Sequence, residues 1–582
     1  MPIEYSVSIA YDDIYPDYVT VDIKELIKNI PTAMALTLVC HYTGQIHTQE
    51  KNSKFQLQAI NDWCRRFDIK TIARIQNTLN SFTTKGKSNF NFINNVTSLY
   101  LVESLLENKN DLPVEKDLSP EQEENLFKAY LYFSAKWTQQ QEAGALNYKD
   151  ISIAYMTLVM MLPYAEIFEF KDFRIQFLKA VYFFKFCESS KIFKEYLQIF
   201  LAARGLNTWN EYLLNLVSVY STILQKDKLK TVLEFTKESE SVFTSLQPFC
   251  VNADEFKPVL DFLTLRETPI FKKTDTELLF LNINFFIDKI YQSIIFDFAE
   301  ILIKEGVSYH NKAISTKPKF FGIFGDEFIE PGLFYKVMEY VFQKKKHQGN
   351  YRHFTGEELK TKFGSGTPDY LIIDKSKLYV FEFKNAIFSG PIKYTFDIDK
   401  IKNELDKKLV KNDAGRPKGV TQLVNFIEDV TNGRYKDILT EDVSKYIIYP
   451  ILVITDFTFN LPVIPSIVTT EFDEILEAKK LGKYKLEVRK LTMVDLDSLI
   501  KFQDLFREKK LTLNHVLNDY QLFLSKATNL IDKSVSFHRY IHLKTAEMKY
   551  DTPKLFWTEI KKTFFNNDTL EKTGEQIPIK ED

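Results

Sequence analysis

The stretch GTPDYLIIDKSKLYVFEFKN (366–385) decides the fold of the surrounding chain, because it predicts two short apolar strands joined by a polar turn. A two-residue turn at Lys375-Ser376 sets a register that places Asp369 opposite Glu382. Directly opposed residues of an antiparallel pair have Cβ atoms about 5 Å apart. The register therefore brings two carboxylates together at the open end of a hairpin.

The second strand of this hairpin adds further polar groups. Side chains alternate along a strand, so Glu382 and Lys384 share one face. Mg²⁺ typically takes one or two carboxylates among its oxygen ligands. Asp369, Glu382 and the backbone carbonyl of Phe383 could supply three oxygen atoms. The metal would polarise a phosphodiester and acidify a bound water, and Lys384 would orient that water and stabilise the developing charge. The pattern predicts a Mg²⁺ or Mn²⁺ site suited to phosphodiester hydrolysis.

Pro368-Asp369 followed by Glu382-Phe383-Lys384 resembles the signature of the PD-(D/E)XK nuclease superfamily, the fold of restriction endonucleases. The resemblance implies the roles just described and an order of helix, three-stranded meander, helix and strand. It implies DNA as the favoured substrate, although nothing in the hairpin excludes RNA, and a homodimer with one active site per DNA strand. Two alternatives remain open: a nuclease fold that has lost its activity, and a hairpin whose ion pairs serve only to stabilise the structure.

The residues before the hairpin predict the first helix of the order that the resemblance implies. Pro331 fits a first helical position, with Glu330 before it, and the apolar residues that follow recur at helical spacing. Members of the superfamily often carry a metal-associated glutamate on this helix, so the resemblance implies that role for Glu330. The alternative is that Glu330 caps the helix.

The chain after the hairpin predicts the second helix at Val420–Val430, with Gln422 where many members of the superfamily have a glutamine facing the site. The pattern resembles the Gln-x-x-x-Tyr motif of RecB-like nucleases, but Phe426 replaces the tyrosine. The alternative is a solvated Gln422. A near-continuous apolar run at Tyr446–Asp456 is typical of a strand buried on both faces, and a strand at 484–491 should lead into a helix at Met493–Phe502.

The net charge of −2 hides a basic region around the predicted site, because residues 341–420 contain 17 Lys and Arg against 10 Asp and Glu. Basic side chains there could neutralise phosphates of a nucleic acid. Any single lysine run can also be plain solvated surface. The predicted phosphate contacts are Lys344, Lys345, Lys346, Lys408, Lys411, Arg416 and Lys418.

Several classes of protein are disfavoured by the sequence. It contains no P-loop, so no Walker-type ATP hydrolysis is expected. It has no apolar run of membrane-spanning length and no basic secretory n-region. Its four cysteines are widely spaced, which indicates free thiols in a cytoplasmic protein. His538 and His542 are four residues apart, but no glutamate motif lies nearby. We expect them to be ordinary surface residues rather than zinc ligands.

The whole chain predicts several domains: a largely α-helical N-terminal half, an α/β restriction-endonuclease-like nuclease domain and a helical C-terminal segment. The predicted parts are a mixed α/β region at 1–110, a helical sensor or regulatory region at 121–307, the nuclease domain at 313–506, and helices with a polar tail at 507–582. In the first region, Tyr5–Ala10 and Tyr18–Ile23 could be strands. In the second, 276–304 reads as helix. The chain from about residue 310 onward is expected to fold alone.

The function that this sequence favours is a metal-dependent nuclease acting on DNA. Nuclease domains of the superfamily are often joined to sensor modules in prokaryotic immunity systems, so an effector of bacterial defence against phage is the expected setting, with a partner protein as a possible activator. The alternative is a catalytically inactive nuclease fold that serves as a nucleic-acid-binding or scaffolding subunit.

Overall fold

The computed structural model describes residues 7–16, 21–48, 53–84, 90–113, 117–148, 152–168, 171–225, 228–342, 351–481, 486–529 and 532–565. Within these ranges, no helix combines the length and the apolar character needed to cross a membrane. All four cysteines are free thiols, as predicted: Cys40, Cys64 and Cys187 are buried and Cys250 is partly buried.

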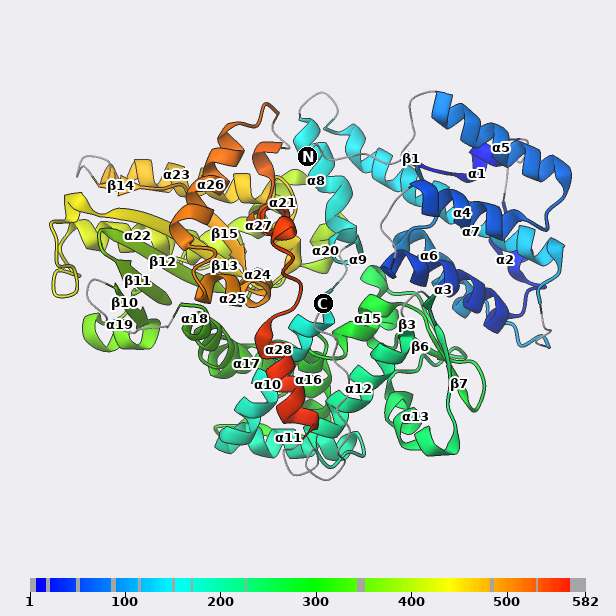
Figure 1. Cartoon of the computed structure of the whole chain (residues 1–582), viewed down its shortest axis with the longest axis horizontal. Helices are drawn as coiled ribbons and strands as arrows, with labels where there is room; N and C mark the ends of the chain where they lie inside the picture. The colour runs from blue at the N-terminus through cyan, green and yellow to red at the C-terminus, as the bar shows by residue number, and fades with distance from the viewer. Residues whose placement is uncertain are drawn as a thin grey trace. The chain divides into compact units, whose positions relative to one another are not determined.

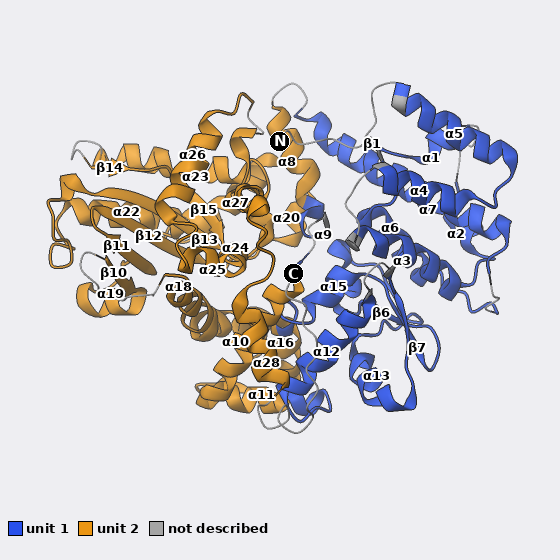
Figure 2. Ribbon diagram, viewed as in Figure 1, with its two compact units in different colours: residues 1–150, 163–171, 201–294 blue, residues 151–162, 172–200, 295–582 orange. Residues whose placement is uncertain are grey.

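Two compact units make up the chain, and each is assembled from segments that are far apart in the sequence (Figure 2). The first unit combines residues 1–150, 163–171 and 201–294. The second unit combines residues 151–162, 172–200 and 295–582.

The first unit is mainly helical (Figure 1). Its longer helices are α3 (Thr32–Thr48), α4 (Ser53–Cys64), α5 (Ile69–Thr84), α6 (Asn95–Glu107), α7 (Pro120–Leu146) and α12 (Trp209–Ile223). Its shorter helices are α1 (Tyr11–Ile14), α2 (Ile23–Ile27), α9 (Ala165–Phe168), α13 (Glu240–Leu246), α14 (Leu263–Glu267) and α15 (Ile283–Asp288). Its strands are β1 (Val7–Ser8), β2 (Phe90–Asn91), β3 (Leu224–Gln225), β4 (Lys228–Leu229), β5 (Val232–Glu234), β6 (Ile270–Lys272) and β7 (Glu277–Phe280).

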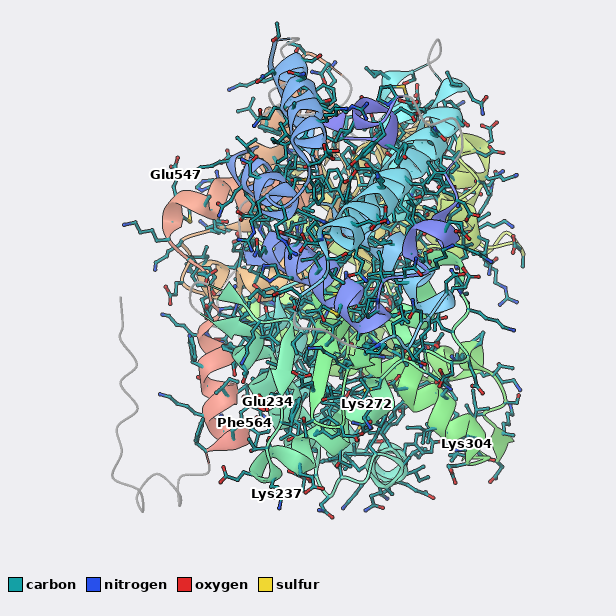
Figure 3. All side chains as sticks on the ribbon, turned by 90° about the vertical axis from the view of Figure 1, so that its right-hand side faces the viewer. Glu234, Lys237, Lys272, Lys304, Glu547 and Phe564 are labelled. Carbon is teal, nitrogen blue, oxygen red and sulfur yellow. The ribbon has the colours of Figure 1, made fainter. Side chains whose placement is uncertain are left out.

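A small antiparallel sheet lies in the first unit, with β7 paired to β5 on one side and to β6 on the other. Leu233, Leu278 and Leu279 are buried in it. Glu234 and Lys272, exposed at the same end of the sheet, are labelled in Figure 3.

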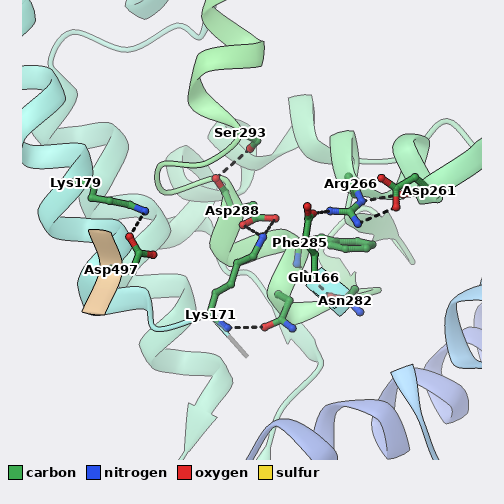
Figure 4. A network of polar contacts seen from close by, with 11 residues as sticks. Glu166, Lys171, Lys179, Asp261, Arg266, Asn282, Phe285, Asp288, Ser293 and Asp497 are labelled. Carbon is green, nitrogen blue, oxygen red and sulfur yellow. Dashed lines mark hydrogen bonds and ion pairs between the residues drawn. The ribbon is translucent and has the colours of Figure 1, made fainter. Parts of the chain in front are cut away.

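Ion pairs hold the segment that contains α9 inside the first unit (Figure 4). Arg266 donates to Glu166 at 2.8 Å and to Asp261 at 3.2 Å. Lys171 Nζ lies 2.6 and 2.7 Å from the two carboxylate oxygens of Asp288. Glu166 and Lys171 thereby contact residues about a hundred positions later in the chain, which explains why this segment belongs to the first unit.

Two expectations for this unit hold only in part. The N-terminal region is mainly helical, with two short strands, β1 and β2. Among the described residues of the first expected strand, Val7–Ser8 form a strand, and Ile23, the end of the second, begins helix α2. Residues 18–20 of the second lie outside the described residues. The stretch 276–304 is not one helix, because it contains strand β7 followed by α15 and α16 (Ile294–Lys304), the latter in the second unit.

The second unit is built around a mixed sheet (Figure 1). Its strands are β10 (Tyr351–Thr355), β11 (Tyr370–Asp374), β12 (Lys377–Lys384), β13 (Ile447–Ile454), β14 (Glu487–Val488) and β15 (Thr492–Asp495). The first three form an antiparallel meander, β13 is parallel to β12, and both β14 and β15 are parallel to β13. Strand β13 is nearly all buried, as its continuous apolar sequence predicts.

Helices cover both faces of this sheet. The helices of the unit are α8 (Ile153–Met161), α10 (Phe173–Ser189), α11 (Lys191–Ala203, of which residues 191–200 belong here), α16, α17 (Lys317–Phe324), α18 (Tyr335–Phe342), α19 (Gly356–Phe363), α20 (Gly390–Lys393), α21 (Ile398–Leu405), α22 (Gly419–Thr431), α23 (Ile464–Ala478), α24 (Leu496–Lys501), α25 (Gln503–Arg507), α26 (Leu513–Ser525), α27 (Phe537–Thr545) and α28 (Lys554–Phe564). A short pair, β8 (Ser308–Tyr309) and β9 (Lys312–Ala313), completes it.

Side chains of β12 show which helix covers which face. Phe383 stacks on Phe334 with ring centroids 4.6 Å apart, and Phe381 lies 6.3 Å from Phe342 of α18. Lys384 points to the other face, where its Cε lies 3.3 Å from the position that a Cβ on Gly419 would take. Helix α22 and the α18 region therefore pack on opposite faces of the sheet.

Helix α10 and residues 295–342 share one aromatic core within the second unit. The ring of Phe183 lies 5.1 Å from Phe298, 5.3 Å from Phe324 and 5.2 Å from Phe328. Lys179 of the same helix pairs with Asp497 at 2.7 Å (Figure 4). The expectation that the chain folds alone from about residue 310 therefore conflicts with a core to which α10 and α16 contribute.

Two element boundaries near the site also differ from expectation. The upstream helix begins at Lys317 rather than at Pro331, and Pro331 lies inside a π-helix (Gly325–Phe334) that continues into α18. Glu330 is therefore not an N-terminal cap. The expected helix at Met493–Phe502 starts as strand β15, and α24 begins only at Leu496.

Candidate metal centre

The hairpin of β11 and β12 has the register that the sequence predicts. Asp374 pairs with Lys377 and Tyr370 with Phe381, and Asp369 precedes β11 directly. The same register continued by one residue places Asp369 opposite Glu382. Lys375 occupies the left-handed region at φ 54°, which a tight two-residue turn requires.

Four groups converge at the open end of this hairpin. Oδ2 of Asp369 accepts a hydrogen bond from the backbone N–H of Phe383 at 2.7 Å. Nζ of Lys384 donates to Oε2 of Glu382 and to the carbonyl oxygen of Phe383, both at 3.0 Å. The same ammonium lies 3.6 Å from Oδ2 of Asp369. Two carboxylates, one carbonyl and one amine thus meet at one end of the hairpin, as the sequence predicts.

Burial makes the charges of this cluster costly. The side chain of Glu382 is 1 % exposed, those of Lys384 and Asp369 are 16 % and 18 % exposed. Burial first, and then the charge of Asp369, raise the pKa of Glu382 well above its usual value. Burial alone would lower the pKa of Lys384, but Glu382 and Asp369 raise it overall. The lysine is therefore an ammonium ion at neutral pH.

Glu330 approaches the same cluster of charges from the π-helix. Its backbone carbonyl accepts from the N–H of Tyr335, five residues later, and its Oε1 accepts from the Tyr335 hydroxyl at 2.6 Å. Burial and then the charge of Asp369 raise the pKa of Glu330, while Tyr335 and Lys384 lower it. The structure therefore brings Glu330 within electrostatic reach of Asp369 and Lys384.

Helix α22 begins beside the lysine. Its first residue, Gly419, leaves no room for a larger side chain, because a Cβ there would lie 2.6 Å from Cδ1 of Leu452 and 3.3 Å from Cε of Lys384. Burial, and then the neighbouring charges of Lys408 and Lys384, lower the pKa of Lys418 just before this helix. Lys408 and Lys418 therefore form a basic flank next to the carboxylates.

The remaining predicted residues make no hydrogen bond or ion pair with Asp369 or Glu382, or they lie outside the described residues. Gln422 is partly buried on α22, and no hydrogen bond joins its side chain to Asp369, Glu382 or Lys384. Lys411 and Arg416 are exposed in the loop before α22, where Lys411 lies 4.0 Å from Asp406. Lys344, Lys345 and Lys346 lie outside the described residues.

Sequence reasoning missed two residues of this centre, Tyr335 and Gly419. Tyr335 is five positions after Glu330, a spacing that faces the same way only in a π-helix and not in an α-helix. Gly419 follows the polar loop and reads as a loop residue, so only the packing of α22 against β12 shows why a glycine stands there.

The donor set suits a hard divalent cation. It offers carboxylate and carbonyl oxygens, the ligand type of Mg²⁺ and Mn²⁺, and it already holds a cation, the ammonium of Lys384. Among the side chains that the structure describes, no three or more His, Cys, Asp or Glu are arranged as they stand to hold a metal ion. The predicted ligands therefore fit as two carboxylates and a carbonyl, with Glu330 as an additional group.

No family model matches the chain, and neither a curated protein nor a solved structure matches it.

Proposed function

We propose that the chain is a metal-dependent nuclease that hydrolyses phosphodiester bonds, with a Mg²⁺ or Mn²⁺ ion held by Asp369, Glu382 and the carbonyl of Phe383. The observation that carries the proposal is the meeting of these oxygens with Lys384 at the end of one hairpin. The order of helix, three-stranded meander, helix and parallel strand supports it, because the PD-(D/E)XK resemblance implies that order.

The metal and the residues of the centre have separate roles in the proposed hydrolysis. When bound, the metal supplies Lewis acidity toward the phosphate and acidifies a water molecule. Lys384 carries a positive charge and donates hydrogen bonds, so it can stabilise charge on a phosphate oxygen and orient the water, but as an ammonium it cannot accept a proton. Glu330, held by Tyr335, is placed to contribute a further carboxylate.

Lys408 and Lys418 would hold neighbouring phosphates of the substrate. Burial and then the charges of Lys408 and Lys384 lower the pKa of Lys418, and a phosphate beside it would offset this effect. The proposed substrate is DNA, because that is what most of the resembling superfamily cleaves. A role as an effector of defence against phage rests on the pairing of this unit with a mainly helical one.

The experiment that tests the proposal incubates the full chain with linear, circular and single-stranded DNA and with RNA, with Mn²⁺ or with EDTA. Cleavage should require Mn²⁺ and should fall by about a hundredfold or more in Asp369→Asn, because metal charge stabilisation contributes several kcal/mol. Asp374→Asn is the matched control: it removes a carboxylate from the turn end of the same hairpin and should cleave normally. Equal cleavage by the wild type, Asp369→Asn and Asp374→Asn, or cleavage in EDTA, would contradict the proposal.

One observation favours the second function, a nucleic-acid-binding or scaffolding protein without cleavage. Lys384 pairs with both carboxylates without a metal, so the centre can also serve as a structural ion-pair cluster. Calorimetry separates the two functions. No binding of millimolar Mn²⁺ in the presence of DNA, together with DNA binding, would support the scaffold.

A further inference from the structure

We infer that Lys384 acts as an internal cation that occupies the metal-binding oxygens and must leave them before a divalent ion can bind. The inference rests on the proposed function and adds a form of regulation to the same site. It assigns to Lys384 a role in the metal-free protein that is separate from any role in catalysis.

The contacts of the ammonium group carry this inference. Nζ of Lys384 lies 3.0 Å from Oε2 of Glu382, 3.0 Å from the carbonyl oxygen of Phe383 and 3.6 Å from Oδ2 of Asp369. These are the same three groups that the hairpin offers to a metal. A divalent ion and the ammonium therefore compete for one set of oxygens.

The fold favours this position of the ammonium, because the carboxylates need a neighbouring positive charge. Glu382 is almost fully buried and stands opposite Asp369, so without a cation the two carboxylates would repel each other with little solvent to screen them. Lys384 supplies one positive charge on a flexible four-carbon chain, which can swing away when a stronger cation arrives. The lysine thus stabilises the metal-free state and weakens metal binding.

Calorimetry with Mn²⁺ tests the competition by comparing the full-length wild type, Lys384→Met and Lys418→Met. The Lys384→Met variant keeps the length of the side chain and removes its charge, so it should bind Mn²⁺ at least about tenfold more tightly, because the cation no longer has to be displaced. Lys418→Met removes a nearby charge that lies outside the oxygen set, and its affinity should change less than about threefold.

The outcomes separate this inference from the proposed function. Mn²⁺ binding by the wild type with equal or weaker binding by Lys384→Met would overturn the inference alone. No binding by either protein would overturn the proposed function and the inference with it. Binding by Lys384→Met alone would support both, because it would show that the lysine blocks the site.

A measurement on the wild type covers the case in which Lys384→Met does not fold. Lysine acylation by an activated ester, read by mass spectrometry, reports how free each ammonium is. Mn²⁺ at saturation should raise the labelling of Lys384 several-fold relative to that of Lys418, because the metal releases it from the carboxylates. Unchanged or reduced labelling of Lys384, with Mn²⁺ binding proved by calorimetry, would refute the displacement.

Discussion

If the proposed centre binds a metal, replacing Tyr335 by Phe should move the pH at which the metal binds. The substitution removes only the hydroxyl that donates to Oε1 of Glu330 at 2.6 Å. This hydrogen bond lowers the pKa of Glu330 against burial and the charge of Asp369, which raise it. Without the hydroxyl, the pKa of Glu330 rises further, and the carboxylate form that a metal needs is populated only at higher pH.

The expected size follows from the contact. A hydrogen bond to a charged group contributes about 1.5–3 kcal/mol, and one pKa unit corresponds to about 1.4 kcal/mol. Glu330 is only partly buried, so solvent screens the contact and the lower end of this range applies. The midpoint of Mn²⁺ affinity against pH should therefore rise by about one unit, with wild type and variant converging well above it.

Calorimetric Mn²⁺ titrations across the pH range measure this midpoint. Tyr340→Phe is the matched control, because it is the same substitution on the same helix, and its hydroxyl instead donates to Asp504 at 3.1 Å. It should leave the midpoint unchanged. Identical pH profiles for Tyr335→Phe and wild type would refute the reasoning that Tyr335 positions Glu330 for the metal.

Three further outcomes are expected. Burial raises the pKa of Glu103 from 4.5 to about 8, so stability that is full below pH 4.5 is lost as pH rises toward 8, by about 1.4 kcal/mol per unit; urea unfolding should show this slope vanish in Glu103→Gln. A fragment that begins at Ala313 lacks α10 and α16 and should be insoluble, whereas a soluble, cooperatively melting fragment would disprove the shared aromatic core. The double variant Lys408→Ala with Lys418→Ala should weaken DNA binding and reduce the slope of log affinity against log salt by up to about two; an unchanged slope would show that neither lysine contacts phosphate.

The local geometry of the hairpin could be predicted from the sequence because every signal in it is local. Strand alternation has a period of two residues, and a polar turn of two residues fixes the register. Once Lys375 and Ser376 are taken as the turn, the pairing of Asp369 with Glu382 follows without any knowledge of the rest of the chain. Strand β13 and helix α22 were predictable for similar reasons, a continuous apolar run and a helical period.

The assembly of the second unit could not be predicted in this way. Phe183 packs against Phe298, Phe324 and Phe328, all more than a hundred residues away. Its own helix is apolar along most of its length, which is equally compatible with a core in the first unit. Only tertiary contacts decide which segment packs into which core. A single sequence contains no pattern from which such contacts can be predicted.

The π-helix is the feature of the centre that is hardest to predict from the sequence. Proline favours a first helical position, so Pro331 predicts a helix start and turns Glu330 into a cap. In the structure the wider i→i+5 hydrogen bonding lets the helix continue through the proline. The wider turns also carry Tyr335 back over Glu330, where one tyrosine holds both the carbonyl and the carboxylate of the same residue. Since π-bulges are frequent at functional sites, the irregularity that hides Glu330 in the sequence also favours the proposal that Glu330 contributes to the metal centre.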